Sequence, residues 1–192
     1  PKDELDLDAT IDETCDNAGH LKIVYRRPRK NTVRLLLLMD SGGSMDEHRE
    51  LCAQLFTAVR QSNHFKDLRI YYFHNYIGRY LYTTPELRYY DRVESDKVLA
   101  ELDQRYKTII FGDGEMSPYE LTDHYYGMSG LERLRLFKNH FSHLVWITPT
   151  EMTYRKGSWY RASYDMISEE VPMYVMTISD LERAFKHLMV NR

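Results

Sequence analysis

The chain is poor in cysteine, which argues against a fold held together by disulfides. Its 192 residues include two cysteines, Cys15 and Cys52, whereas small secreted domains that depend on disulfides carry them densely. Cys52 falls within a helical pattern of apolar residues and is best interpreted as a small core thiol. This cysteine usage predicts a reducing, cytoplasmic setting.

Long apolar runs and a strong net charge are also absent. No stretch reaches the roughly 20 apolar residues of a membrane span, and the first residues lack the pattern of a secretory signal. With 26 Lys and Arg against 29 Asp and Glu, the net charge of −3 gives no general attraction to nucleic acid or membranes. We therefore expect neither as a partner. Because the first residue is Pro1 and not Met, we expect further sequence before it.

The first part of the chain differs in charge from the rest. Acidic residues crowd the first sixteen positions, and a short basic turn follows a few residues later. The pattern predicts a short helix over residues 8–17 and a strand over residues 21–26. We therefore predict an acidic then basic N-terminal extension over residues 1–31 and a second domain over residues 32–192.

From residue 32 onward, apolar runs alternate with helical patterns. Residues 33–39, apolar except for Arg34, form the kind of run that a strand buried on both faces requires. The strands expected after it span residues 68–73, 79–82, 108–111, 144–147 and 173–177, and the expected helices span residues 47–60, 97–102, 130–140, 164–170 and a last one capped by Ser179 and Glu182. This alternation predicts an α/β fold: a doubly wound, mainly parallel sheet with helices on both faces and one antiparallel edge strand.

Two aspartates follow strands of this predicted sheet. Asp40 comes directly after residues 33–39, and Asp113 lies between two glycines after residues 108–111. Parallel strands place their carboxyl ends at one edge, so we expect the two carboxylates to converge there. Asp40 and Ser44, joined by a two-glycine turn, offer the oxygen ligands that suit Mg²⁺. The alternative is that Ser44 and Glu47 form a capping box and merely start a helix.

These motifs resemble a known metal-binding family. Residues 35–45, LLLLMDSGGSM, resemble the first half of the metal-ion-dependent adhesion site (MIDAS) of von Willebrand factor type A (vWA) domains, and residues 111–114 resemble its second aspartate. More narrowly, DSGGSMDEH, YYFHN and GDGEMSPYEL resemble the bacterial CoxE-like branch, as does the acidic lead-in. The resemblance implies a vWA, Rossmann-like fold, in agreement with the strand and helix pattern.

The resemblance also implies a set of ligands for Mg²⁺ or Mn²⁺. Asp40 matches the first aspartate of the family's DxSxS motif, Ser44 its second serine, and Asp113 the later aspartate. Gly42 stands where the family has its first serine, so one hydroxyl ligand is missing. The preferred candidate for the family's later threonine is Ser95, and the alternatives are Thr83 and Thr84.

Three functions are compatible with this site. The resemblance implies a non-enzymatic interaction module whose metal accepts an acidic residue from a partner protein. CoxE-like proteins act with MoxR-type AAA+ ATPases, so the chain is expected to be an adaptor or co-chaperone of such an ATPase. One alternative is a metal-assisted hydrolase that uses Asp40 and Asp113 around Mg²⁺, with His74 and Glu115 as the nearest acid–base candidates. The other is a scaffold with a degenerate metal site.

Overall fold

The computed structural model divides the chain into two compact units, Pro1–Arg34 with Arg49–Leu68 and Leu35–His48 with Arg69–Arg192. In the first unit, β1 (Glu4–Leu5) pairs antiparallel with β2 (Tyr25–Arg26). The helix predicted over residues 8–17 and the end of the helix predicted over residues 47–60 lie largely outside the described residues. The structure describes residues 4–6, 9–10, 13, 22–26, 33–53, 57, 65–124 and 127–189.

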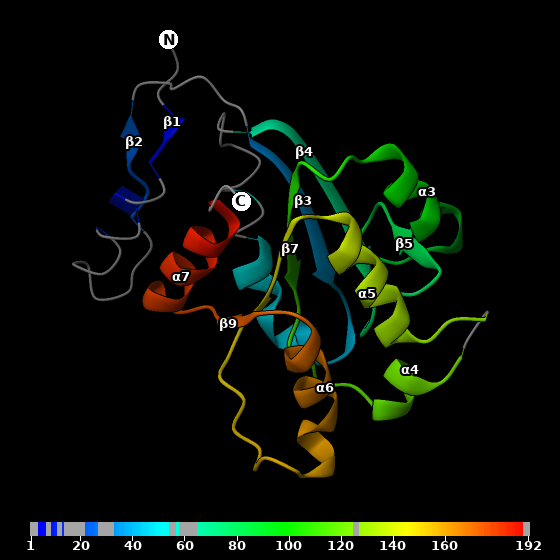
Figure 1. The fold of residues 1–192 in the computed structure, drawn as a ribbon. Helices are drawn as coiled ribbons and strands as arrows, with labels where there is room; N and C mark the ends of the chain where they lie inside the picture. Colours follow the sequence, from blue (N-terminus) through cyan, green and yellow to red (C-terminus); the bar gives the residue numbers. More distant parts are fainter. Residues whose placement is uncertain are drawn as a thin grey trace. The chain divides into compact units, whose positions relative to one another are not determined.

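A seven-stranded sheet with the order β6-β5-β4-β3-β7-β8-β9 forms the centre of the fold (Figure 1). β5 runs antiparallel to both of its neighbours, whereas β7, β8 and β9 run parallel. The predicted α/β class with a mainly parallel sheet is therefore confirmed. β6 was not predicted, because three residues are too few to carry a pattern. The strands are β3 (Val33–Asp40), β4 (Phe65–Phe73), β5 (Tyr80–Tyr82), β6 (Arg92–Glu94), β7 (Tyr106–Phe111), β8 (His143–Thr148) and β9 (Met173–Val175).

Two helices, α4 and α5, begin with capping boxes, in which side chains satisfy exposed backbone N–H groups. At α5, Ser129 and Glu132 form a reciprocal capping box with bonds of 3.2 and 2.8 Å, and the predicted bounds of this helix are confirmed. The other helices whose bounds fall within the described residues are α3 (Ser95–Glu101), α4 (Pro118–Thr122), α6 (Ala162–Glu170) and α7 (Ile178–Met189), with 3₁₀ turns η1 (Gly43–His48), η2 (Tyr89–Asp91) and η3 (Trp159–Arg161).

The predicted start of the last helix was wrong. α7 begins at Ile178, so Ser179 lies inside its first turn instead of capping it. The hydroxyl of Thr177 accepts the N–H of Asp180 at 3.4 Å, and the Thr177 carbonyl accepts the N–H of Leu181 at 2.9 Å. Thr177 offers the same capping hydroxyl two residues earlier, which lets the helix begin sooner.

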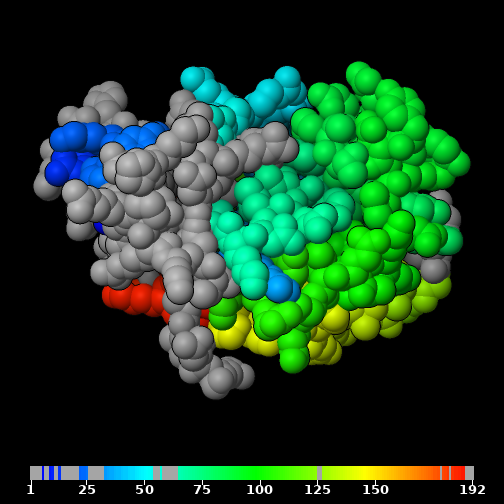
Figure 2. Space-filling model, turned by 90° about the horizontal axis from the view of Figure 1, so that it is seen from above, coloured from blue at the N-terminus to red at the C-terminus, as the bar shows by residue number. Residues whose placement is uncertain are grey.

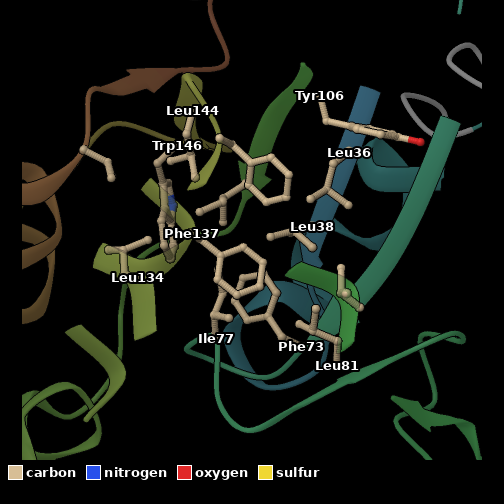
Figure 3. Close-up of a cluster of buried hydrophobic side chains, with 14 of the residues drawn as sticks. Leu36, Leu38, Phe73, Ile77, Leu81, Tyr106, Leu134, Phe137, Leu144 and Trp146 are labelled. Carbon is tan, nitrogen blue, oxygen red and sulfur yellow. The ribbon is translucent and has the colours of Figure 1, made fainter. Parts of the chain in front are cut away.

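Alternate residues of the central strands bury themselves on opposite faces of the sheet. Leu36 and Leu38 point into one cluster with Phe137 of α5, in which Phe73 and Trp146 meet edge to face at 6.2 Å (Figure 3). On the same side an ion pair between Arg133 and Asp96 joins α5 to α3. The space-filling view shows the green and yellow parts of the chain packed against one another (Figure 2).

The opposite face of the sheet is covered as well. α7 packs against β8 and β9, and the alternate β3 residues Leu35, Leu37 and Met39 are buried. The rigid centre of the fold is therefore β3 and its neighbours, from whose ends the polar loops extend. Within the described ranges, every helix is too short or too polar to cross a membrane.

Candidate functional site

Three strands end next to one another at one edge of the sheet. The N–H of Ser41, after β3, donates to the carbonyl of Phe73, the last residue of β4, at 2.9 Å. Gly112, after β7, lies so close to β3 that a Cβ built on it would be 2.9 Å from the Cβ of Asp40. β3, β4 and β7 therefore run in the same direction, and their carboxyl ends bring the loops of Asp40 and Asp113 together, as the sequence predicted.

Asp40 is a buried carboxylate with little compensation for its charge. Its side chain accepts the N–H of Asn75 at 2.9 Å, and the residue is 5% exposed. Burial raises the pKa of Asp40 to about 7; the Asn75 bond opposes this, and the charges of Asp113 and Glu120 add to it. Among the described residues, no basic side chain lowers the pKa of Asp40. A bound cation would supply the missing positive charge.

The loop after β7 brings two more carboxyl groups to this edge: that of Asp113, which is buried, and that of Glu115 beside it. The Asp113 side chain accepts the N–H of Glu115 at 2.8 Å, which closes a tight turn after β7. Partial burial and the charge of Asp113 raise the pKa of the Glu115 carboxyl, and His48 opposes this shift. The indole N–H of Trp146 donates to the carbonyl of Gly112 at 2.8 Å and holds the loop in place. The edge therefore concentrates negative charge on fixed backbone.

The turn after Asp40 requires its two glycines. Gly42 and Gly43 have φ angles of 85° and 58°, a region that side-chain-bearing residues rarely adopt. The ring of His74 lies over the turn, and a Cβ on Gly43 would be 3.3 Å from its Cε1. His74 is itself held by a hydrogen bond of 3.0 Å between its Nδ1 and the carbonyl of Ser41. Side chains at either glycine would strain the backbone beside Asp40.

Comparison with known families agrees with this geometry. Residues 1–114, more than half of the chain, match the model of the family described as "VWA domain containing CoxE-like protein". The chain belongs to this family. The matched region includes both aspartate loops and ends directly after the second, at Gly114. No curated protein and no solved structure matches the chain.

Within this vWA domain, Ser44 lies in the exposed 3₁₀ turn that follows Asp40. η1 begins at Gly43, so Ser44 lies inside the turn and not in front of it. Ser44 is exposed, and among the described residues its hydroxyl forms no hydrogen bond. The alternative that Ser44 only caps a helix therefore has no contact to support it.

Ser95 is not brought to the aspartates. Its fully buried hydroxyl donates to the carbonyls of Gly78 and Arg79, at 2.9 and 3.1 Å, and so fixes the start of α3. β5 and β4 lie between β6, which Ser95 follows, and β3. At about 4.8 Å per strand, three spacings separate Ser95 from Asp40 by roughly 14 Å, too far for a common ion.

The two alternatives for the threonine position are also engaged elsewhere. The hydroxyl of Thr83 donates to the carbonyl of Asp91 at 3.2 Å, and that of Thr84 donates to the Asp91 carboxylate at 2.9 Å. Both bonds stabilise the turn between β5 and β6. Among the described residues, no group of three or more His, Cys, Asp or Glu side chains is arranged to hold a metal ion. A Mg²⁺ ion here would have few protein ligands and would keep several bound waters, as Mg²⁺ usually does in proteins.

Asn75 is a site residue that the sequence reading missed. It has a left-handed φ of 62°. Its N–H donates to Asp40, while its side-chain amide donates to Oε1 of Glu120 at 2.8 Å. Glu120 also accepts the N–H of Ser117 at 3.0 Å and thereby caps α4. Asn75 thus links the buried aspartate to α4. The only sequence signal for it is an Asn between two predicted strands, which indicates a turn but not a contact with Asp40.

Two substitutions separate the effect of the left-handed backbone of Asn75 from the effect of its side-chain bond to Glu120. Asn75→Gly keeps the backbone N–H and tolerates the left-handed φ, but removes the bond to Glu120. Asn75→Ala removes the same bond and adds backbone strain, so we expect it to be less stable than Asn75→Gly by about 1 kcal/mol in urea unfolding. Both should speed amide hydrogen exchange in α4, because both lose the bond to Glu120. Equal stability of the two variants, or unchanged exchange in α4, would contradict these roles.

Proposed function

We propose that this vWA domain is a metal-dependent protein-interaction module. Asp40 would bind Mg²⁺ or Mn²⁺, and an acidic residue of a partner protein would complete the coordination. The observation that carries the proposal is the buried carboxylate of Asp40, which backbone N–H groups only partly compensate and whose pKa is raised to about 7 by burial, with Asp113 and Glu120 adding to the shift. A divalent ion would lower the pKa of Asp40 again, because its positive charge favours the ionised carboxylate.

The residues around Asp40 fit a hard cation with open positions. The hydroxyl of Ser44 is a second oxygen ligand, and Asp113 would act through a bound water. Gly42 supplies no ligand in place of the family's serine, and the exposed Gly43 and Ser44 leave the outer side of the loop accessible. The ion would supply a positive charge that attracts a carboxylate. Asn75 would keep Asp40 oriented through its N–H bond.

The partner side of the proposal rests on the family. As a CoxE-like vWA protein, the chain would act with a MoxR-type AAA+ ATPase in the cytoplasm, as an adaptor or co-chaperone that presents a client. An interaction module needs no acid–base pair. The alternative of a metal-assisted hydrolase is favoured by Glu115, whose raised pKa beside Asp113 suits a general acid. Metal-dependent turnover that requires both Asp40 and Glu115 would support the hydrolase.

Calorimetry with Mg²⁺ and Mn²⁺ tests the metal site directly. Wild type should bind one ion with modest affinity, since Gly42 removes a ligand, and Asp40→Ala should show no binding. Glu169→Ala is a matched control, because Glu169 is an exposed carboxylate of α6. Identical heats from wild type and Asp40→Ala would rule out the proposed site.

A further inference from the structure

Four exposed aromatic side chains gather at the edge of the sheet that carries the aspartates. Trp159 and Tyr160 of η3 are 56% and 71% exposed, Tyr119 of α4 is 59% exposed, and Tyr154 is 42% exposed. The segment between β8 and α6 leaves the carboxyl end of β8, and Figure 1 shows it beyond the arrowhead of β3, beside α6. Tyr119, Tyr154, Trp159 and Tyr160 are called the aromatic platform below.

Contacts within the segment hold the platform in a defined conformation. Tyr154 and Tyr160 stack at 5.4 Å between ring centroids, and Tyr119 packs against Trp159 at 5.5 Å. Arg161 donates a hydrogen bond to the carbonyl of Tyr154 at 3.3 Å, and it forms an ion pair with the carboxylate of the residue four positions later in the chain. Rings held in place lose little conformational entropy when a partner binds, which favours affinity.

The platform adjoins the metal site through short connections. Tyr119 directly precedes Glu120, which accepts a hydrogen bond from Asn75, the residue that holds Asp40. The hydroxyl of Ser163, just after η3, donates to the carbonyl of Met116 at 2.5 Å. The loop after β7 also packs on α6, since a Cβ on Gly114 would be 3.6 Å from the Tyr164 ring. A partner seated on the platform would therefore lie at the same edge of the sheet as Asp40.

Basic residues lie beside the aromatic platform, whereas the metal site is acidic. Arg155 and Lys156 lie between Tyr154 and Trp159, and within the described part of the chain neither forms an ion pair. One acidic residue, Glu151, lies in the same segment. Clustered Trp and Tyr side chains beside basic residues have the composition of protein-binding hot spots. An acidic peptide segment complements these basic residues.

We propose that the aromatic platform binds an acidic segment of the partner protein, one carboxylate of which reaches the ion at Asp40. This inference rests on the proposed function. Apolar and aromatic side chains of the partner pack on the platform, while Arg155 and Lys156 attract its other carboxylates. The family match ends at residue 114, so the whole platform lies outside it. The platform determines which acidic partner this chain selects.

Trp159 provides its own reporter of binding. It is 56% exposed, whereas the second tryptophan, Trp146, is 2% exposed, so a ligand on the platform changes the Trp159 emission. The probe is a random copolymer of glutamate and tyrosine, which is titrated into the protein in a buffer that contains either Mg²⁺ or EDTA. We expect saturable binding to wild type with Mg²⁺ and at least tenfold weaker binding to Tyr119→Ala and Tyr160→Ala. Tyr89→Ala is the control, since Tyr89 is as exposed but lies in η2.

The outcomes separate the platform from the metal. Tyr160→Ala should still bind Mg²⁺ in calorimetry, because it leaves Asp40 unchanged. If wild type binds the copolymer equally well in Mg²⁺ and in EDTA, and Asp40→Ala binds it as tightly as wild type in Mg²⁺, the metal-dependent function fails while the platform stands. Wild-type affinity in Tyr119→Ala and Tyr160→Ala overturns the platform, as does a lack of binding to the acidic copolymer. Tighter binding to a lysine–tyrosine copolymer, oligothymidylate or phosphatidylserine vesicles overturns the proposed class of partner.

Discussion

Asp40→Asn should stabilise the metal-free protein at neutral pH and abolish its binding of Mg²⁺. The neutral amide has the size of the carboxylate and can still accept the N–H of Asn75. It carries no charge to be buried or repelled by Asp113 and Glu120, the causes that raise the pKa of Asp40 to about 7. At pH 8 and in EDTA, the free energy of unfolding should increase by up to about 4 kcal/mol.

The same variant should remove a pH dependence of stability. In the metal-free wild type, Asp40 has a folded pKa of about 7, above its ordinary value of 3.8. The folded state therefore holds a proton that the unfolded state has released, and stability falls as the pH rises from about 4 through 7. Asp40→Asn should show a much flatter profile in urea unfolding over this range. A wild type that gains stability between pH 5 and 8 in EDTA would contradict the raised pKa.

Metal binding should have the opposite pH dependence. An ion needs the ionised carboxylate, so protons compete with Mg²⁺ at Asp40. The apparent affinity should be roughly tenfold weaker at pH 6 than at pH 8, because the pKa of Asp40 is about 7. Calorimetry at the two pH values checks this, and equal affinities would show that the ion is not bound through Asp40.

Gly112→Ala should damage the site and the fold together. The new Cβ would lie 2.9 Å from the Cβ of Asp40, 3.2 Å from its Oδ2 and 3.4 Å from the ring of Trp146. Neither neighbour is a flexible chain end, since Asp40 ends a buried strand and Trp146 is 2% exposed. We expect a loss of about 2 kcal/mol in the free energy of unfolding. The displaced Asp40 should also bind Mg²⁺ at least tenfold more weakly.

Gly78→Ala is the matched control for this effect. A Cβ on Gly78 meets its nearest neighbour, the ring of Tyr76, at an ordinary 3.5 Å. Its stability should therefore stay close to that of wild type or increase slightly, because alanine reduces the entropy of the unfolded chain. If both variants lose the same stability, the close approach of Gly112 to Asp40 is not the cause.

The strongest sequence predictions concerned elements with long patterns. The apolar run of β3, the helix α5 and the convergence of Asp40 with Asp113 follow from strand order and from where parallel strands end. Short or context-dependent features failed, as β6 and the cap of α7 show. Ser95 was preferred as a ligand because it precedes a helix, yet its hydroxyl bonds the carbonyls of a hairpin. Local sequence does not reveal the distance between strands of one sheet.

The sequence by itself determined the α/β class, the alternation of strands and helices along the chain and the glycine turn after Asp40, because these depend on periodicity and on local backbone conformation. The tertiary structure alone decided the raised pKa of Asp40, the link through Asn75 and the grouping of the aromatic platform. The physical reason is that burial, charge repulsion and ring contacts depend on distance in space. Asn75 is 35 residues from Asp40 and 45 from Glu120, and the sheet brings all three together.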